Sequence, residues 1–198
     1  MPTAHTLPPV RLDPPRKLWT RPEYDELAST GALDQMRLEL VEGELIDKMG
    51  KKRPHVISLV ELQSWLAEVF GARYVNPEAP IDVAPEDNPS NEPEPDIIVL
   101  RRKHSEFAKA NPRPEDLHLV VEIADTSLMF DLTTKAGLYA RAGIVEYWVL
   151  DIAGRRLIVH REPQSGRYTS VAVYSEQESV APLAAPQSQF RVSGAFPA

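Results

Sequence analysis

The sequence predicts an α/β fold, at the border with α+β, in which a mixed β-sheet is flanked by helices. Two short and strongly apolar runs, at residues 96–100 and 117–123, have the length of buried strands. Helical and strand patterns follow one another in the order α-β-β-α-β-β-α-β-β-β, with few helices. Prolines number 19 but are absent from residues 115 to 162, so a core can run there without interruption.

The N-terminal part is predicted to hold an irregular arm, a helix and a hairpin. Five prolines among the first 15 residues leave residues 1–18 too few backbone donors for a helix or a ladder. A capping box at residues 20–23 opens a helix that runs through about Ser29. Two alternating runs then meet at Glu42-Gly43, which is typical of a hairpin, and Glu39 lies on the face opposite the leucines of the first strand.

The later elements are predicted from periodicity and from turn residues. Apolar residues at helical spacing predict a helix over 54–70. The Pro-rich segment 77–95 contains a possible strand near 81–83. Asp131 is expected to cap a helix through Arg141. Three strands are expected to complete the sheet, at residues 145–150, 156–160 and 167–174.

Length and composition indicate one domain. The chain has 198 residues, and we place the domain at residues 19–192 and a C-terminal tail at 193–198. The absence of cysteine excludes disulfides, thiolate zinc sites and cysteine nucleophiles. No apolar run reaches the length of a membrane span, and the first residues lack the apolar region of a signal peptide. We therefore expect a soluble, cytoplasmic protein.

The acidity of the chain comes from one segment. Residues 77–100 carry seven acidic residues and no Lys or Arg, and the rest of the chain carries 22 residues of each sign. A net charge of −7 does not steer a protein toward nucleic acid, which counts against a DNA-binding role. The same segment would nevertheless concentrate negative charge beside a cation site and repel a phosphate backbone until a metal binds.

Each of the two most apolar runs carries a carboxylate. Asp96 opens the first run, directly after Pro95, and Glu122 lies inside the second. A carboxylate buried in such a strand is costly unless a cation or strong donors pair with it. Two carboxylates at the ends of neighbouring strands suit Mg²⁺ or Mn²⁺, which could activate water for attack on a phosphodiester. Lys135, on the next predicted helix, could stabilise the charge that develops in such a reaction.

These residues carry a resemblance to a known group. Pro95-Asp96, then Glu122, then a lysine displaced onto the following helix, resembles the pattern of the PD-(D/E)xK nuclease superfamily. More narrowly, the chain is similar to the Uma-two family of restriction-endonuclease-like proteins over about residues 20–190. The similarity rests on the ELVEGEL run at residues 39–45 and on the nearly continuous block at 119–151.

The resemblance implies a restriction-endonuclease-like core and an endonuclease that cuts DNA with Mg²⁺ or Mn²⁺. Asp96 and Glu122 would be metal ligands, Lys135 the catalytic lysine, and Glu44 an additional acidic residue at the edge of the site. Ala124 stands two residues after Glu122, where the superfamily usually has its lysine, so activity depends on Lys135. Cutting both strands with one site per chain favours a two-fold homodimer.

Basic residues that follow two of the proposed site elements are candidate phosphate contacts. His55 matches a common histidine of the family and is grouped with them, although the resemblance gives it no defined role. The candidates are Lys51, Lys52, Arg53, Arg101, Arg102 and His55.

Each main candidate also has a plain structural interpretation. Asp96 could cap a turn, and Glu122 could form a buried ion pair with an arginine. Lys135 could pair with Asp131, four residues earlier, on the surface of a helix. Glu44 could face solvent from a hairpin strand. The alternative function is a non-catalytic nucleic-acid- or protein-binding module on the same fold.

Overall fold

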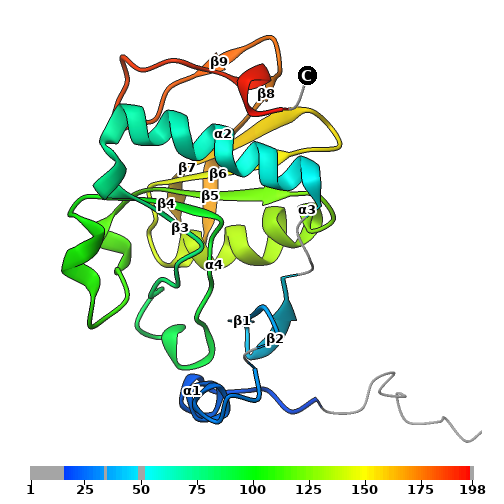
Figure 1. Cartoon of the computed structure of the whole chain (residues 1–198), viewed down its shortest axis with the longest axis vertical. Helices are drawn as coiled ribbons and strands as arrows, with labels where there is room; N and C mark the ends of the chain where they lie inside the picture. Colours follow the sequence, from blue (N-terminus) through cyan, green and yellow to red (C-terminus); the bar gives the residue numbers. More distant parts are fainter. Residues whose placement is uncertain (1–15, 34, 49–51, 197–198) are drawn as a thin grey trace, which may run out of the picture.

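A six-stranded mixed sheet forms the centre of the protein in the computed structural model, which describes residues 16–33, 35–48 and 52–196 (Figure 1). The strand order is β3-β4-β5-β6-β7-β8, and only β5 and β6 pair in parallel. The predicted mixed sheet flanked by helices is thus confirmed. The strands are β3 (Val75–Pro77), β4 (Ile97–Leu100), β5 (Leu117–Ala124), β6 (Glu146–Asp151), β7 (Arg156–Gln164) and β8 (Arg167–Ser175).

Helices cover both faces of this sheet (Figure 1). On one face lies α2 (Arg53–Phe70), whose buried leucines pack against alternate residues of β4 and β5. On the other face lies a continuous helical stretch formed by α3 (Leu128–Phe130), a π-helical segment (Asp131–Lys135) and α4 (Ala136–Arg141). Because side chains alternate along a strand, each run of apolar residues fills two cores at once.

A small subdomain stands outside the main sheet, on the side of α4 (Figure 1). It consists of α1 (Arg21–Ser29) and the hairpin β1 (Leu38–Val41)–β2 (Glu44–Asp47). The predicted capping box and hairpin are both present. Glu42 and Gly43 have φ angles of 51° and 75°, as a two-residue turn of this kind requires. A Cβ atom at position 43 would lie 2.9 Å from the Cβ of Leu18, so the close approach also needs glycine.

The C-terminal residues belong to the fold. After β8, the short strands β9 (Ser179–Val180) and β10 (Phe190–Arg191) pair with each other, and a 3₁₀ turn, Val192–Ala195, follows. Ala195 and Phe196 are buried in the same core as the leucines of α2. The domain therefore extends beyond residue 192, and residues 193–196 are not the tail that the sequence predicted.

Two further local predictions are wrong. Ile81 and Val83 are buried, but residues 81–83 join no ladder. Their N–H groups bond to Asn88 and Pro93 of the same Pro-rich segment and to Pro112 of the loop before β5, and the edge strand is β3 instead. Asp131 does not cap a helix, because the helical stretch begins at Leu128 and Asp131 lies inside it.

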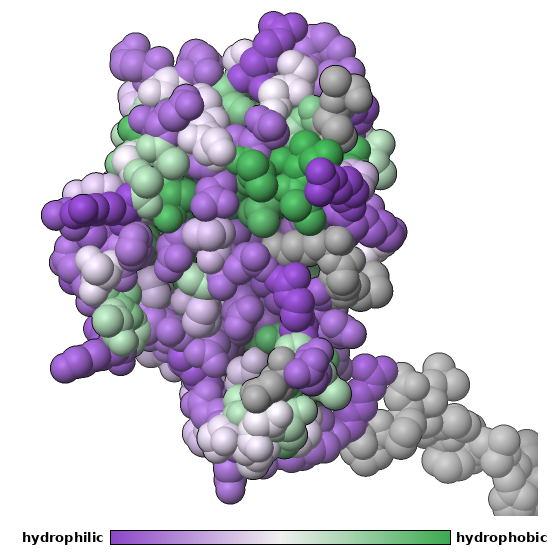
Figure 2. Space-filling model, viewed as in Figure 1, coloured by the Kyte–Doolittle hydropathy of each residue, from purple (hydrophilic) through white to green (hydrophobic). Residues whose placement is uncertain are grey.

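One face of the molecule shows an apolar patch over the region of α2, surrounded by hydrophilic residues (Figure 2). Val60, on this helix, has 52% of its surface exposed. Over the described part of the chain, no helix combines the length and the apolar character that crossing a membrane requires.

Candidate active site

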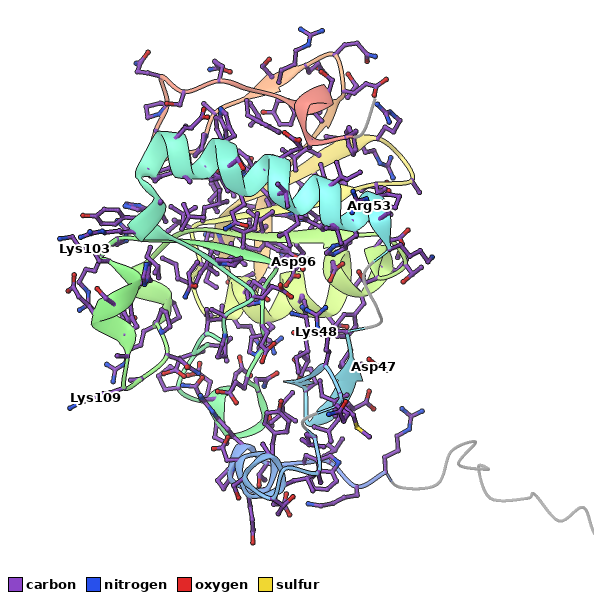
Figure 3. All side chains as sticks on the ribbon, in the orientation of Figure 1. Asp47, Lys48, Arg53, Asp96, Lys103 and Lys109 are labelled. Carbon is purple, nitrogen blue, oxygen red and sulfur yellow. The ribbon has the colours of Figure 1, made fainter. Side chains whose placement is uncertain are left out.

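A pocket of about 420 Å³ opens where the β1–β2 hairpin, the start of α2 and the helical stretch after β5 meet. Figure 3 shows Asp96 near the centre of this region, with Arg53 at the start of α2 and Asp47 and Lys48 on the hairpin side. Six carboxylates line the pocket, against three lysines and one histidine. The acidic residues are Glu39, Asp47, Asp96, Glu122, Asp125 and Asp131. The lining is therefore short of positive charge.

Asp96 and Glu122 are brought together by the register of two strands. Ile97 pairs with Val121 across the antiparallel β4–β5 ladder, so one step further Asp96 lies opposite Glu122. Both carboxylates are buried, with 5% and 3% of their residue surfaces exposed. Asp96 Oδ2 accepts a hydrogen bond of 2.8 Å from the N–H of Ile123, which extends the ladder through a side chain. The predicted pairing of two strand-end carboxylates is thus present in the fold.

Lys135 lies between two carboxylates. Its Nζ atom is 2.8 Å from Glu122 Oε1 and 2.8 Å from Glu39 Oε1, and only 2% of the residue is exposed. Tyr139, one turn further on, donates a hydrogen bond of 2.9 Å to the same Glu122 oxygen. Glu39 is itself fixed, because its Oε2 accepts the N–H of Glu94 at 3.0 Å. Glu122 therefore has a buried cationic partner, which is this lysine rather than an arginine.

The π-helical segment presents two ionisable groups to the pocket. Asp131 and Lys135 are the first and last residues of this segment, and both are buried and line the pocket. They do not form the exposed pair that their spacing allowed. The hydroxyl of Ser127 donates a hydrogen bond of 2.6 Å to Asp131 Oδ2, and Tyr147 donates one of 3.1 Å to the backbone carbonyl of Asp131. Single π-turns within α-helices are frequent at functional sites.

Burial and mutual repulsion shift the proton affinities of this cluster. Burial raises the pKa of Glu122 to about 8, against the opposing effect of Lys135. Burial likewise raises the pKa of Asp131 to about 6. Burial alone would lower the pKa of Lys135, but Glu122, Glu39 and Asp131 raise it above its ordinary value, so the ammonium stays charged. One buried cation thus faces several carboxylates, an arrangement that favours the entry of a further cation.

His55 lies on the buried face of α2 at the edge of the same pocket. Its Nε2 atom is 3.3 Å from Asp96 Oδ2, and 9% of the residue is exposed. Its Nδ1 atom has no hydrogen-bond partner among the described residues. The histidine is therefore buried beside Asp96 rather than exposed.

Glu44 is not at the pocket. Its carboxylate pairs with Arg16 at 3.0 Å, and 45% of its side chain is exposed. The hairpin instead supplies Glu39 and Asp47 to the pocket. Glu39, which contacts Lys135, was assigned from the sequence only to a strand face. The signal was available, because Glu39 lies in an apolar run between Leu38 and Leu40 as Glu122 lies in VVEI.

The basic candidates divide into two groups. Lys52 lines the pocket, 3.4 Å from Asp125 Oδ2, and Arg53 is exposed beside it at the start of α2. Lys51 lies outside the described residues. Arg101 and Arg102 follow the end of β4 opposite to Asp96, and Arg102 is bound to Asp116 at 2.8 Å. Figure 3 shows the neighbouring Lys103 at the left edge of the protein and Arg53 at the right. These two arginines do not lie at the pocket.

Comparison with known proteins decides the family. The profile of the Uma-two family, which is described as "Putative restriction endonuclease", matches residues 21–193. The chain belongs to this family. No curated protein matches the sequence of this Uma-two protein. A similar solved structure is that of "a putative nuclease belonging to DUF820 from Anabaena variabilis", with a TM-score of 0.66 and 19% identity over 82% of this chain and 90% of that chain. At this identity the likeness shows a common fold.

The donor set of this Uma-two protein fits a hydrated hard cation. Among the described residues, no group of three or more His, Asp or Glu side chains is arranged as a complete metal site. Mg²⁺ usually keeps several waters and binds through one or two carboxylates, and the pair of Asp96 and Glu122 matches that ligand number. A structural zinc site would need four protein ligands.

Proposed function

We propose that this protein is a nuclease that hydrolyses phosphodiester bonds of DNA and depends on Mg²⁺ or Mn²⁺. The observation that carries the proposal is the buried cluster of Asp96, Glu122 and Lys135, held on two paired strands and one helix around a single pocket. Family membership supports the nuclease class, and the excess of carboxylates over cations supports the metal.

In this proposal Asp96 and Glu122 hold the ion. The ion would supply a bound water of lowered pKa and a positive charge beside the scissile phosphate. Lys135 keeps its proton because of its carboxylate neighbours, and its ammonium can donate to an oxygen on which charge develops. Glu39 holds the ammonium in place from the hairpin. Tyr139 and Ile123 hold the two metal-binding carboxylates by hydrogen bonds.

The charge around the pocket supports an order of binding. With six carboxylates in the lining, the pocket without a cation repels a phosphate backbone. A bound divalent ion would reverse part of this charge. Lys52 lines the pocket and the exposed Arg53 follows it in the chain, so both could contact the phosphates of a DNA strand. We therefore expect the metal to be required for tight DNA binding as well as for cleavage.

A cleavage assay tests the proposal. Plasmid and single-stranded DNA, and RNA as a comparison, are incubated with the protein and Mg²⁺, Mn²⁺ or EDTA. We expect cleavage of DNA with either metal, none with EDTA and none with Glu122→Ala. Glu122→Ala that cleaves as well as the parent would rule out the assigned site, and preferential cleavage of RNA would correct the substrate.

The alternative is a non-catalytic binding module. One observation favours it, because Lys135 is 2% exposed and already has two carboxylate partners. Calorimetric titration with Mn²⁺ separates the two functions. A nuclease site binds the metal and loses this binding when Asp96 and Glu122 are both replaced by alanine. A binding module shows no such dependence.

The proposal includes a homodimer, because one site per chain cuts one strand at a time. The support is the edge strand β8, where Val171 and Val173 are 54% and 56% exposed and Arg167 is the only charged residue. An antiparallel pair of β8 strands about a two-fold axis would place Val171 against its copy and continue the sheet. Analytical ultracentrifugation should give the mass of two chains, reduced to one by Val171→Lys. A monomeric parent protein would exclude the dimer.

A further inference from the structure

His55 has contacts that the cleavage chemistry proposed above does not use. It is nine-tenths buried on the first turn of α2, lines the pocket, and places its Nε2 atom 3.3 Å from Asp96 Oδ2. We propose that His55 is a positioning residue that fixes the orientation of the Asp96 carboxylate toward the metal. This inference rests on the proposed metal-dependent function and assigns His55 a part in it.

The state of the imidazole follows from its surroundings. A neutral imidazole carries its proton on one nitrogen. On Nδ1 the proton would be buried with no acceptor among the described residues. On Nε2 it would lie on the nitrogen that is 3.3 Å from Asp96 Oδ2. In the Nε2–H tautomer, Nδ1 carries a lone pair and leaves no buried N–H without an acceptor. The structure therefore favours the Nε2–H tautomer.

The same observation argues against His55 as a metal ligand. A histidine that binds a metal through one nitrogen almost always donates the N–H of the other to a carboxylate, a carbonyl or water. Over the described residues, Nδ1 of His55 has no such partner. Nor do the described residues contain a metal-binding group of three or more His, Asp or Glu side chains. His55 therefore acts through Asp96.

The effect on Asp96 comes from two layers of the fold. The N–H of Ile123, in β5, donates to Asp96 Oδ2 at 2.8 Å, and Nε2 of His55, in α2, lies 3.3 Å from the same oxygen. Contacts from two separate elements restrict how the carboxylate can turn about its bond to Cβ, and with it the direction in which the carboxylate meets a cation.

Calorimetric titration of the full chain with Mn²⁺ at constant pH tests the inference. Removing a group that orients a metal ligand typically weakens metal affinity about 10–100-fold, and we expect this increase in Kd for His55→Ala. His55→Gln keeps an N–H at a similar reach and should restore most of the affinity. Ser58→Ala is the matched control, because Ser58 is buried one turn further along α2 and its hydroxyl has no partner among the described residues.

The outcomes separate this inference from the function on which it rests. If the parent protein binds Mn²⁺ and Asp96→Asn abolishes binding while His55→Ala leaves Kd unchanged, only the inference fails. If the parent binds no Mn²⁺, the proposed function and the inference both fail. Long-range ¹H–¹⁵N correlation spectra of the metal-free protein give a readout independent of metal: the Nε2–H tautomer of His55 is expected, and the Nδ1–H tautomer would overturn the contact.

Discussion

Lys135→Met is expected to lower the free energy of unfolding by about 3–5 kcal/mol in the metal-free protein, because it leaves buried carboxylates without their cation. Lys135 is the partner of both Glu39 and Glu122 at 2.8 Å, and it also lies near the buried Asp131. Methionine keeps most of the volume of the lysine side chain, so the loss reports charge rather than packing. The same substitution should abolish DNA cleavage.

The loss of stability in Lys135→Met should depend on pH. A buried carboxyl with a raised pKa binds its proton more tightly in the folded than in the unfolded chain, so its contribution to stability falls as pH rises between the two values. In the parent protein this interval runs from 4.5 to about 8 for Glu122 and from 3.8 to about 6 for Asp131. Without Lys135 both values rise further. The variant should therefore be closest to the parent near pH 5 and furthest from it above pH 8.

Urea unfolding in EDTA at several pH values measures this effect. Lys52→Met is the matched control, because Lys52 lines the same pocket but has 65% of its side chain exposed and pairs with Asp125 at the rim. A surface ion pair contributes at most about 1 kcal/mol, so the control should unfold almost as the parent does at every pH. Equal stability of Lys135→Met and Lys52→Met at pH 8 would contradict the buried ion-pair arrangement.

The local sequence determines much of the fold. The capping box at Thr20, the Glu42-Gly43 turn and Pro54 in the first turn of α2 are short-range signals, and each element that they predict is present. Short-range signals also mislead where tertiary contacts determine the local conformation. Asp131 has the character of a helix cap, but in the folded chain it lies four residues beyond Ser127 inside the helical stretch, buried against the pocket.

Long-range contacts explain the other differences. Residues 81–83 alternate as a strand does, but their backbone groups bond to a neighbouring loop, which no local pattern reveals. Residues 193–196 have no distinctive pattern, and Ala195 and Phe196 are nevertheless buried in the core that the leucines of α2 share. The site could be predicted from a more general principle, that a buried carboxylate in an apolar run needs a partner. This principle identified Glu122 from the sequence, and it applies equally to Glu39.

Glu39→Gln and Glu44→Gln should therefore have opposite outcomes, although the two residues lie in the same hairpin. Glu39 is 3% exposed and holds Lys135, whereas Glu44 is 45% exposed in its side chain and pairs with Arg16. Loss of a residue that orients a metal ligand typically costs about 10–100-fold, and we expect a loss of this order in the cleavage rate of Glu39→Gln, because Glu39 orients Lys135 in the same way. Glu44→Gln should cleave at the parent rate.

Single-turnover cleavage with saturating Mn²⁺ compares the two variants, and urea unfolding shows that each is folded. Saturating metal matters, because Glu39 contacts Lys135 rather than a metal-binding carboxylate, so its loss should persist when the ion is bound. A rate that recovers fully at high Mn²⁺ would instead make Glu39 a contributor to metal affinity. A loss confined to Glu44→Gln would assign the additional acidic residue of the family to Glu44, and the hairpin would then have to move toward the pocket during the reaction.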